Sequence, residues 1–279
     1  MIRFGWSVLT VLIAAVPLAA QDKKLEDART SDAPEPRTVS FKTADGVEIA
    51  ASYYEPTKTG KQQPKAPAAV LVHMYPADRH SWKPIVPRLL EAGFAVLAYD
   101  IRGKGGSAGD RALARRYTER DGPLFVDAWQ DADAAVKWLG EQKHVDTSRI
   151  VMLGASIGCS ISLDYAARNE NVRAVVCLSP GTNYFGVDSK AHIKKCGARP
   201  ILLCAPEAER SEPQELKALA EKAVLDIRPG DRSLHGTNMF GAKYGDKLMD
   251  RIVTFLKKGL EEAEKQEDAK KKEETKKTE

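Results

Sequence analysis

Cysteine is scarce in this chain, with four residues among 279. None belongs to a C-x-x-C pair, and no histidine stands at the spacing typical of zinc ligands, so the sequence supports no metal site. Cys177 and Cys204 lie in the apolar runs AVVCL and ILLCA, where a small buried thiol is expected. At most one disulfide is expected, with Cys196 as its candidate member.

The chain also lacks a run of about 20 apolar residues, the length that crosses a bilayer. The run Val8–Val16 is shorter. It follows Arg3 and precedes small residues at Ala19 and Ala20, which is the layout of a secretory signal peptide. We predict a cleaved signal over residues 1–20, export to the periplasm or the extracellular space, and no stable membrane span afterwards. An uncleaved anchor is the alternative.

Charge of one sign is not concentrated anywhere in the chain. The net charge of +4 is spread along the sequence, which does not favour a nucleic-acid partner. Residues 21–37 place Pro34 and Pro36 among charged residues and are typical of a linker. Residues 261–279 have no aromatic side chain, so they are expected to form a disordered or solvated helical tail. One domain remains, over residues 38–260.

Within that domain, strand and helix patterns alternate. Segments 39–42 and 47–54 alternate around Asp45-Gly46, which predicts a hairpin. Apolar runs without alternation, typical of strands buried on both faces, follow at 68–73, 94–100, 149–154, 173–179, 200–205 and 223–227. Helical patterns are found at 82–92, 126–142, 157–168, 212–222 and 247–260. The order predicts an α/β fold with a mostly parallel eight-stranded sheet and helices on both faces.

The pattern G-x-S-x-G occurs twice, around Ser107 and around Ser156. Ser156 directly follows the run RIVMLG and directly precedes a helical pattern. A tight strand-to-helix turn strains the serine backbone and leaves no room for side chains at Gly154 and Gly158. Ser107 is separated from its strand and leads into the polar stretch GDRALARR, so we expect a loop without a helix after it. Ser156 is therefore the candidate nucleophile.

A serine nucleophile needs a base, and two histidines follow Ser156 in the chain. His192 lies in the basic segment SKAHIKKCG, where a solvated surface position is expected. His235 follows the last strand pattern, and catalytic groups gather beyond the carboxyl ends of strands in open α/β sheets. His235 is therefore the candidate base.

The acid that orients such a histidine is expected after the strand at 200–205, where the sequence reads PEAER. Glu209 is the preferred candidate, because glutamate can orient an imidazole in a Ser-His-Glu set. Glu207 and Asp231 remain alternatives.

Two backbone N–H groups are expected to stabilise an oxyanion. The helix that begins after Ser156 directs the Ile157 N–H toward the developing charge. The second donor is expected in the loop VHMYP, from Tyr75 or from Met74. His73 ends the preceding strand, and a structural hydrogen-bonding role is expected for it.

The domain resembles the α/β-hydrolase family, and in particular its bacterial dienelactone-hydrolase-like and serine-aminopeptidase-like branch. The matching pieces are TADGVEIAASYYEP, LVHMYP, AGFAVLAYDIRGKGGS, GASIG, RPILLCAPEAE and HGT, in that order. The resemblance implies hydrolysis of carboxylic esters, thioesters or amides through an acyl-enzyme, without a metal or organic cofactor. It implies Ser156 as nucleophile, His235 as base, and Tyr75 and Ile157 as oxyanion donors.

The chain departs from that family at two positions. Met74 stands where glycine is common, and Glu209 stands where aspartate is usual. The segment between residues 180 and 200 has room only for a short loop with Tyr184 and Phe185, so no large lid is expected.

The expected function is therefore that of a serine esterase acting on a small-molecule ester or amide. An amide-cleaving aminopeptidase-like enzyme is one alternative. A catalytically inactive hydrolase fold that serves as a binding protein is the other. The sequence does not indicate the oligomeric state.

Overall fold

The computed structural model describes residues 35–57 and 65–278 of the chain. The predicted signal peptide (1–20) and the predicted linker up to residue 34 lie outside the described residues. The predicted domain and the charged tail lie within them, apart from residues 58–64 and 279.

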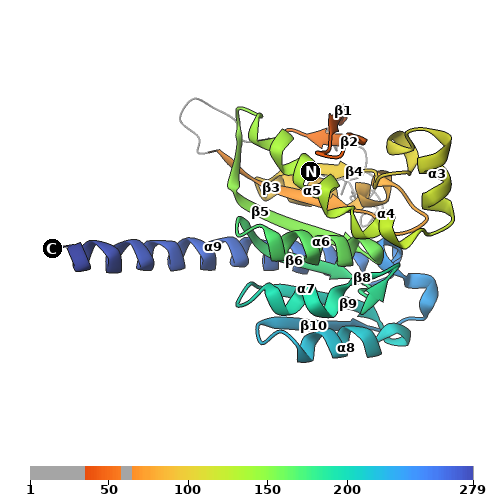
Figure 1. Ribbon diagram of the computed structural model, residues 1–279. Coiled ribbons are helices and arrows are strands. Elements are labelled where there is room, and N and C mark those ends of the chain that lie inside the picture. Colours follow the sequence, from red (N-terminus) through yellow and green to blue (C-terminus); the bar gives the residue numbers. More distant parts are fainter. Residues whose placement is uncertain (1–34, 58–64, 279) are drawn as a thin grey trace, which may run out of the picture. The chain divides into compact units, whose positions relative to one another are not determined.

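The predicted hairpin and the six apolar runs form one eight-stranded sheet (Figure 1), with the strand order β1-β2-β4-β3-β5-β6-β9-β10. The pairs β1–β2 and β2–β4 are antiparallel, and the remaining pairs are parallel. The mostly parallel sheet predicted from the apolar runs is thus confirmed. The strands are β1 (Arg37–Lys42), β2 (Glu48–Tyr54), β3 (Ala66–Val72), β4 (Ala95–Tyr99), β5 (Val145–Ala155), β6 (Val172–Leu178), β9 (Ile201–Pro206) and β10 (Ala223–Arg228).

The core lies on both faces of this sheet, because the central strands are apolar on both sides. Val70 of β3 faces a cluster that includes residues of helices α5 (Trp129–Gly140) and α6 (Ile157–Arg168). Its neighbour Leu71 faces the opposite cluster, with residues of α2 (Val86–Glu91) and α9 (Gly245–Thr278). Helices therefore cover both faces, as predicted (Figure 1).

The helices differ from the sequence prediction in four places. The pattern at 82–92 is a 3-10 segment η1 (Arg79–Ile85) followed by α2, and the pattern at 126–142 is α5 preceded by a separate short helix, α4 (Gly122–Val126). The stretch after Ser107, expected to lack a helix, forms α3 (Arg111–Thr118). Tyr117 is its only fully buried side chain and Leu113, one turn earlier, packs partly buried on the core, so its apolar face is short. Asp110 caps the helix by accepting a hydrogen bond from the Leu113 N–H at 2.8 Å. Helix α8 (Ser211–Ala218) matches its predicted position and ends four residues early.

Residues 179–200 form a small insertion instead of the plain loop that the sequence predicts. It contains a two-stranded hairpin, β7 (Asn183–Tyr184) and β8 (Val187–Asp188), followed by the helix α7 (Ser189–Lys195). The buried Ile193 and a 2.7 Å hydrogen bond between the Ser160 and Ser189 hydroxyls attach α7 to α6. The insertion is packed on the domain, and in the described part of the chain it is the small element that stands where a large lid was not expected.

The charged tail continues α9 as a helix up to Thr278. Among the described residues, no helix is long and apolar enough to span a bilayer. All four cysteines are described, and each is a buried free thiol, so the disulfide allowed by the sequence is not formed. Cys196 is held inside the protein, where its thiol donates a weak hydrogen bond to the Leu163 carbonyl at 3.7 Å.

Candidate active site

Ser156 lies at the turn between β5 and α6, as the sequence predicts. Its backbone has φ +52° and ψ −121°, a region that residues other than glycine rarely adopt. The Ser156 N–H donates to the Leu178 carbonyl at the end of β6 at 2.9 Å, which ties the turn to the sheet. Strain of this kind persists only where the surrounding structure holds it, and it is frequent at functional sites.

The two flanking glycines are required by close backbone packing. A Cβ atom at Gly154 would lie 2.3 Å from the Gly158 carbonyl oxygen, and one at Gly158 would lie 2.1 Å from the Val72 carbonyl oxygen. Both distances are far inside van der Waals contact. The beginning of α6 is therefore pressed against the end of β3, where the loop with Tyr75 begins.

The structure brings His235 and Glu209 together. His235 Nδ1 lies 2.8 Å from Glu209 Oε1, and the two side chains are 27% and 17% exposed. Burial raises the pKa of Glu209, but the hydrogen bond from His235 and the nearby Ser179 hydroxyl outweigh it and leave the pKa below its ordinary value. Glu209 is therefore a carboxylate at neutral pH, able to accept the Nδ1–H and leave Nε2 free as a base.

The alternative acids and the other histidine have different partners. The Glu207 side chain is 55% exposed and pairs with Arg210 at 2.7 Å. Asp231 accepts hydrogen bonds from the N–H and hydroxyl of Ser233. His192 is not the solvated residue that the sequence predicts: its side chain is 16% exposed and lies 3.4 Å from the Asp164 carboxylate.

The three candidate oxyanion donors all lie near the Ser156 turn. In the described part of the chain, the N–H groups of Ile157, Met74 and Tyr75 have no hydrogen-bond acceptor. Ile157 is the first residue of α6, where an N–H has no partner within the helix. The geometry leaves Met74 and Tyr75 both available, with Tyr75 preferred on the resemblance.

His73 has a structural position. Its Nε2 accepts the Ile101 N–H at 3.0 Å, and its Nδ1 lies 2.9 Å from the Met74 carbonyl, so the ring is neutral with the proton on Nδ1. It holds the loop that contains Tyr75 against the end of β4.

Ser156 and His235 lie near each other because their chain neighbours, Ala155 and Gly236, are in contact. A Cβ atom at Gly236, which has φ +58°, would lie 3.4 Å from the Cβ of Ala155. Within the described residues, no hydrogen bond joins the Ser156 hydroxyl to His235. Serine–base hydrogen bonds are often long in free enzymes and tighten when substrate binds.

Sequence reasoning missed one residue of this arrangement and left the role of another open. Ser179, at the end of β6, has φ +53°, accepts the Gly236 N–H at 2.9 Å and lies by Glu209. The phenol of Tyr184 lies beside the Ser156 hydroxyl; burial raises its pKa, and a hydrogen bond with Ser156 opposes that rise. The sequence placed Tyr184 in the short loop between residues 180 and 200 without giving it a role. Ser179 was marked only by its place at the end of the strand pattern 173–179, and that signal was not used.

Ser107, the other serine in a G-x-S-x-G pattern, is fully buried. Its hydroxyl accepts the Ala50 N–H at 2.8 Å and donates to the Asp100 carbonyl at 2.7 Å. It holds the loop after β4 to β2. Across residues 35–57 and 65–278, no group of three or more His, Cys, Asp or Glu side chains could hold a metal ion.

Known proteins resemble this chain over most of its length. It is 24% identical over 243 residues to the uncharacterized protein YfhR of Escherichia coli K12, a match that covers 78% of this chain and 80% of that protein. It is 29% identical over 150 residues to the uncharacterized protein Rv2307c of Mycobacterium tuberculosis, covering 54% of this chain and 47% of that protein. The match thus spans about half the length of the Mycobacterium protein.

Solved structures share the fold at low sequence identity. An esterase of Pyrococcus furiosus, Pf2001, has a TM-score of 0.62 and 20% identity, covering 81% of this chain and 93% of that one. An acylaminoacyl peptidase of Pyrococcus horikoshii has a TM-score of 0.66 and 16% identity, covering 80% of this chain and 41% of that one. The fold is that of the α/β-hydrolases, and the expected serine-hydrolase type of enzyme is supported. Residues 45–225 match the sequence family described as X-Pro dipeptidyl-peptidase (S15 family), and the chain belongs to that family.

Proposed function

We propose that this protein is an exported serine hydrolase that cleaves carboxylic esters through an acyl-enzyme intermediate. The observation that carries the proposal is the 2.8 Å hydrogen bond between His235 and Glu209, formed at the edge of the sheet where the strained Ser156 turn lies. An imidazole held by a carboxylate has the tautomer and the orientation that a general base for serine needs.

The proposed reaction begins with transfer of the Ser156 proton to His235 Nε2. The serine oxygen attacks the carbonyl carbon, and the N–H groups of Ile157 and Tyr75 donate hydrogen bonds to the oxygen that becomes negatively charged. His235 then protonates the leaving alcohol, and the acyl group stays on Ser156. Water, activated by the same histidine, releases the carboxylate product and restores the free serine.

Cleavage of a peptide bond is the second candidate, and the family match favours it. The chemistry at Ser156 is the same, with an amine as the leaving group in place of an alcohol. Recognition of a free substrate amine would require an acidic anchor beside the site. The small size of the 179–200 insertion and the lack of an identified acidic anchor among the described residues favour esters.

A small fluorophosphonate followed by intact-mass spectrometry tests the proposal. We expect a single adduct on the wild type, none on Ser156→Ala, and strongly slowed labelling of His235→Ala. Ser107→Ala, which alters the other G-x-S-x-G serine, is the matched control and keeps the adduct. The same mass reports whether residues 1–20 have been removed, as export predicts.

Substrates then separate the two reactions. We expect short-chain p-nitrophenyl esters to be hydrolysed much faster than Xaa-Pro p-nitroanilides. A reversed preference would establish the peptidase alternative. A folded wild-type protein that takes up no fluorophosphonate would rule out both.

A further inference from the structure

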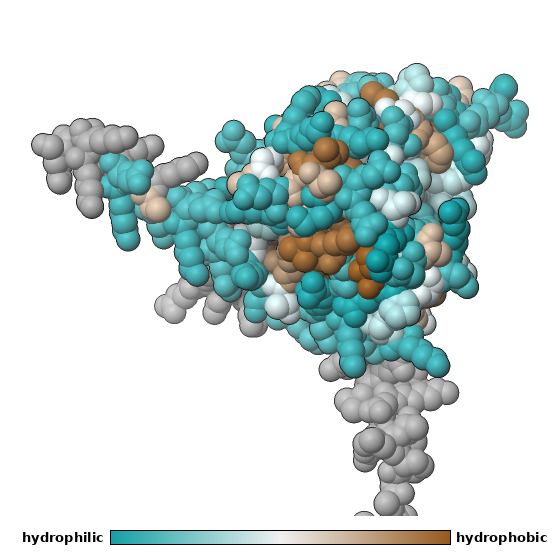
Figure 2. All heavy atoms as spheres, turned by 90° about the horizontal axis from the view of Figure 1, so that it is seen from below, coloured by the Kyte–Doolittle hydropathy of each residue, from teal (hydrophilic) through white to brown (hydrophobic). Residues whose placement is uncertain are grey.

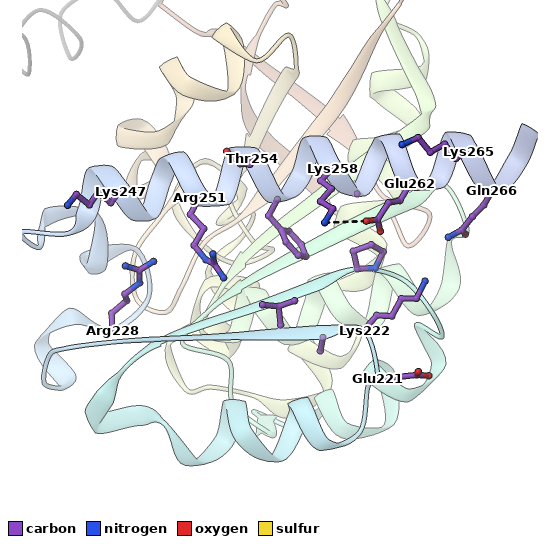
Figure 3. A pocket seen from close by; sticks show the side chains of 15 residues that line it. Glu221, Lys222, Arg228, Lys247, Arg251, Thr254, Lys258, Glu262, Lys265 and Gln266 are labelled. Atoms are coloured by element: carbon purple, nitrogen blue, oxygen red, sulfur yellow. Dashed lines mark ion pairs between the residues drawn. The ribbon is translucent and has the colours of Figure 1, made fainter.

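A groove of about 1060 Å³ lies between β10 and α9. Figure 3 shows the facing surfaces, with α9 along one side and the strand with Arg228 along the other. None of the proposed catalytic residues lines it. Its volume slightly exceeds the range of about 300–1,000 Å³ that is usual for small-molecule sites.

The groove exists because α9 does not cover the last strand of the sheet. Helix α9 packs on β6, and a Cβ atom at Gly259 would lie 2.8 Å from the Cβ of Ala174, so the helix approaches that strand closely. Strand β10 is two strands further along, at the edge of the sheet. The face of β10 that points toward α9 is therefore without a covering helix.

The floor of the groove is apolar. Val224 is 39% exposed, which is unusual for a strand residue of its size, and Phe255 of α9 contributes its ring. Ala223 and Pro200 extend the same surface. Figure 2 views the molecule from the β10 side, and there an apolar strip lies recessed between hydrophilic side chains.

The rim of the groove is basic. Six basic side chains line it. The acidic side chains there are Glu221 and Glu262 in the lining and Asp226 beneath it, so the net charge of the groove is +3. The basic side chains are Lys222, Arg228, Lys247, Arg251, Lys258 and Lys265. A net positive charge around an apolar floor favours a ligand that combines an alkyl body with an anionic group.

Positive charge is least compensated at one end of the groove. Arg228 and Arg251 share the single carboxylate of Asp226, at 2.7 and 2.6 Å. Lys247, on the same side of α9 as Arg251 (Figure 3), has no ion-pair partner among the described residues. An anionic group placed there can meet both a guanidinium and an ammonium group.

We propose that this groove binds a long-chain carboxylate, with the alkyl chain over Val224 and Phe255 and the carboxylate at Lys247 and Arg251. A second copy of the chain fits less well, because a twofold contact would place two basic rims against each other. A flat membrane surface also fits less well, because the apolar floor is recessed. The proposal is independent of the chemistry at Ser156.

Isothermal titration of the full chain with octanoate, decanoate and dodecanoate, each below its micelle concentration, tests the proposal. We expect one site, with an affinity that rises about two- to fourfold for each added methylene, because each one buries apolar surface. Dodecyltrimethylammonium, which has the same chain and the opposite charge, is expected not to bind.

Variants locate the site. Lys247→Glu is expected to weaken dodecanoate binding at least fivefold, and Val224→Glu, which places a negative charge in the floor, to abolish it. Lys257→Glu makes the same charge change at an exposed position of α9 outside the groove and is expected to change the affinity less than twofold.

Three results would overturn the proposal. The first is an affinity that does not depend on chain length, because this indicates simple ion exchange. The second is equal loss of binding in Lys247→Glu and Lys257→Glu. The third is binding only to phosphatidylglycerol vesicles and not to the free carboxylate, which would identify the face as a membrane contact. Lys247 is exposed, so Lys247→Glu is expected to fold and to give a binding affinity even if Val224→Glu does not fold.

Discussion

At the scale of single residues, the candidate site depends on which carboxylate faces His235. Glu207 and Glu209 are two positions apart in the 3-10 segment Glu207–Glu209 and have the same side chain, but only Glu209 turns inward to the imidazole. Its other oxygen, Oε2, is buried and has no hydrogen-bond partner among the described residues.

This difference predicts a matched pair of variants. Glu209→Gln is expected to lower kcat for ester hydrolysis about a hundredfold or more, because an amide cannot stabilise the imidazolium that forms during attack. Glu207→Gln, with the same chemical change on an exposed side chain, is expected to stay within about twofold of the wild type. Steady-state kinetics of the two variants measures both effects. Equal losses would remove Glu209 from the proposed catalytic set.

At the scale of elements, the site depends on how closely α6 approaches β3. The turn at Ser156 brings the first residues of α6 onto the Val72 carbonyl, a contact that only glycine at position 158 allows. The strain at Ser156 is therefore held by backbone packing of two elements and not by the serine itself.

Gly158→Ala is expected to destabilise the protein by about 3 kcal/mol and to abolish labelling by fluorophosphonate, because the added methyl cannot fit beside a rigid strand. Gly241→Ala is the control, since a Cβ atom there meets nothing within 4 Å. Urea unfolding of both variants gives the two free energies. A stable, labelled Gly158→Ala protein would contradict the packing described for α6.

At the scale of the whole molecule, the stability of the fold is linked to pH through His73. Burial lowers the pKa of His73 from 6.5 to about 4, although hydrogen bonding to Met74 opposes this. The unfolded chain binds a proton on this ring between these two values, and the native protein does not. The free energy of unfolding therefore falls as the pH falls through that window.

The linkage predicts a loss of about 2 kcal/mol from His73 between pH 7 and pH 5. The measurement is the free energy of unfolding in urea at both pH values, for the wild type, His73→Gln and His80→Gln. His73→Gln is expected to be less stable at pH 7 and to lose less on acidification. His80 is exposed, so His80→Gln is expected to retain the wild-type dependence. A wild-type slope in His73→Gln would contradict a buried neutral ring.

The sequence by itself determined the order of the eight strands of the sheet, the places of the helices that pack on it, and the serine of the elbow. Apolar runs and glycine spacing are local signals, and they report burial and turn geometry without reference to distant residues. Helix α3 escaped this reasoning because its apolar face consists of little more than Leu113 and Tyr117, too short a stripe to stand out among the arginines around it. The hairpin in residues 183–188 is too short to show a pattern.

Only the tertiary structure decided which side chains meet. The choice of Glu209 over Glu207 and the place of Ser179 depend on how β6, β9 and the loop after β10 converge, which no local pattern encodes. The basic groove was equally invisible in the sequence. Its residues come from α9, β10 and the turns before β9 and β10. The groove forms because α9 crosses the sheet without covering its last strand, β10, and no local pattern encodes that arrangement.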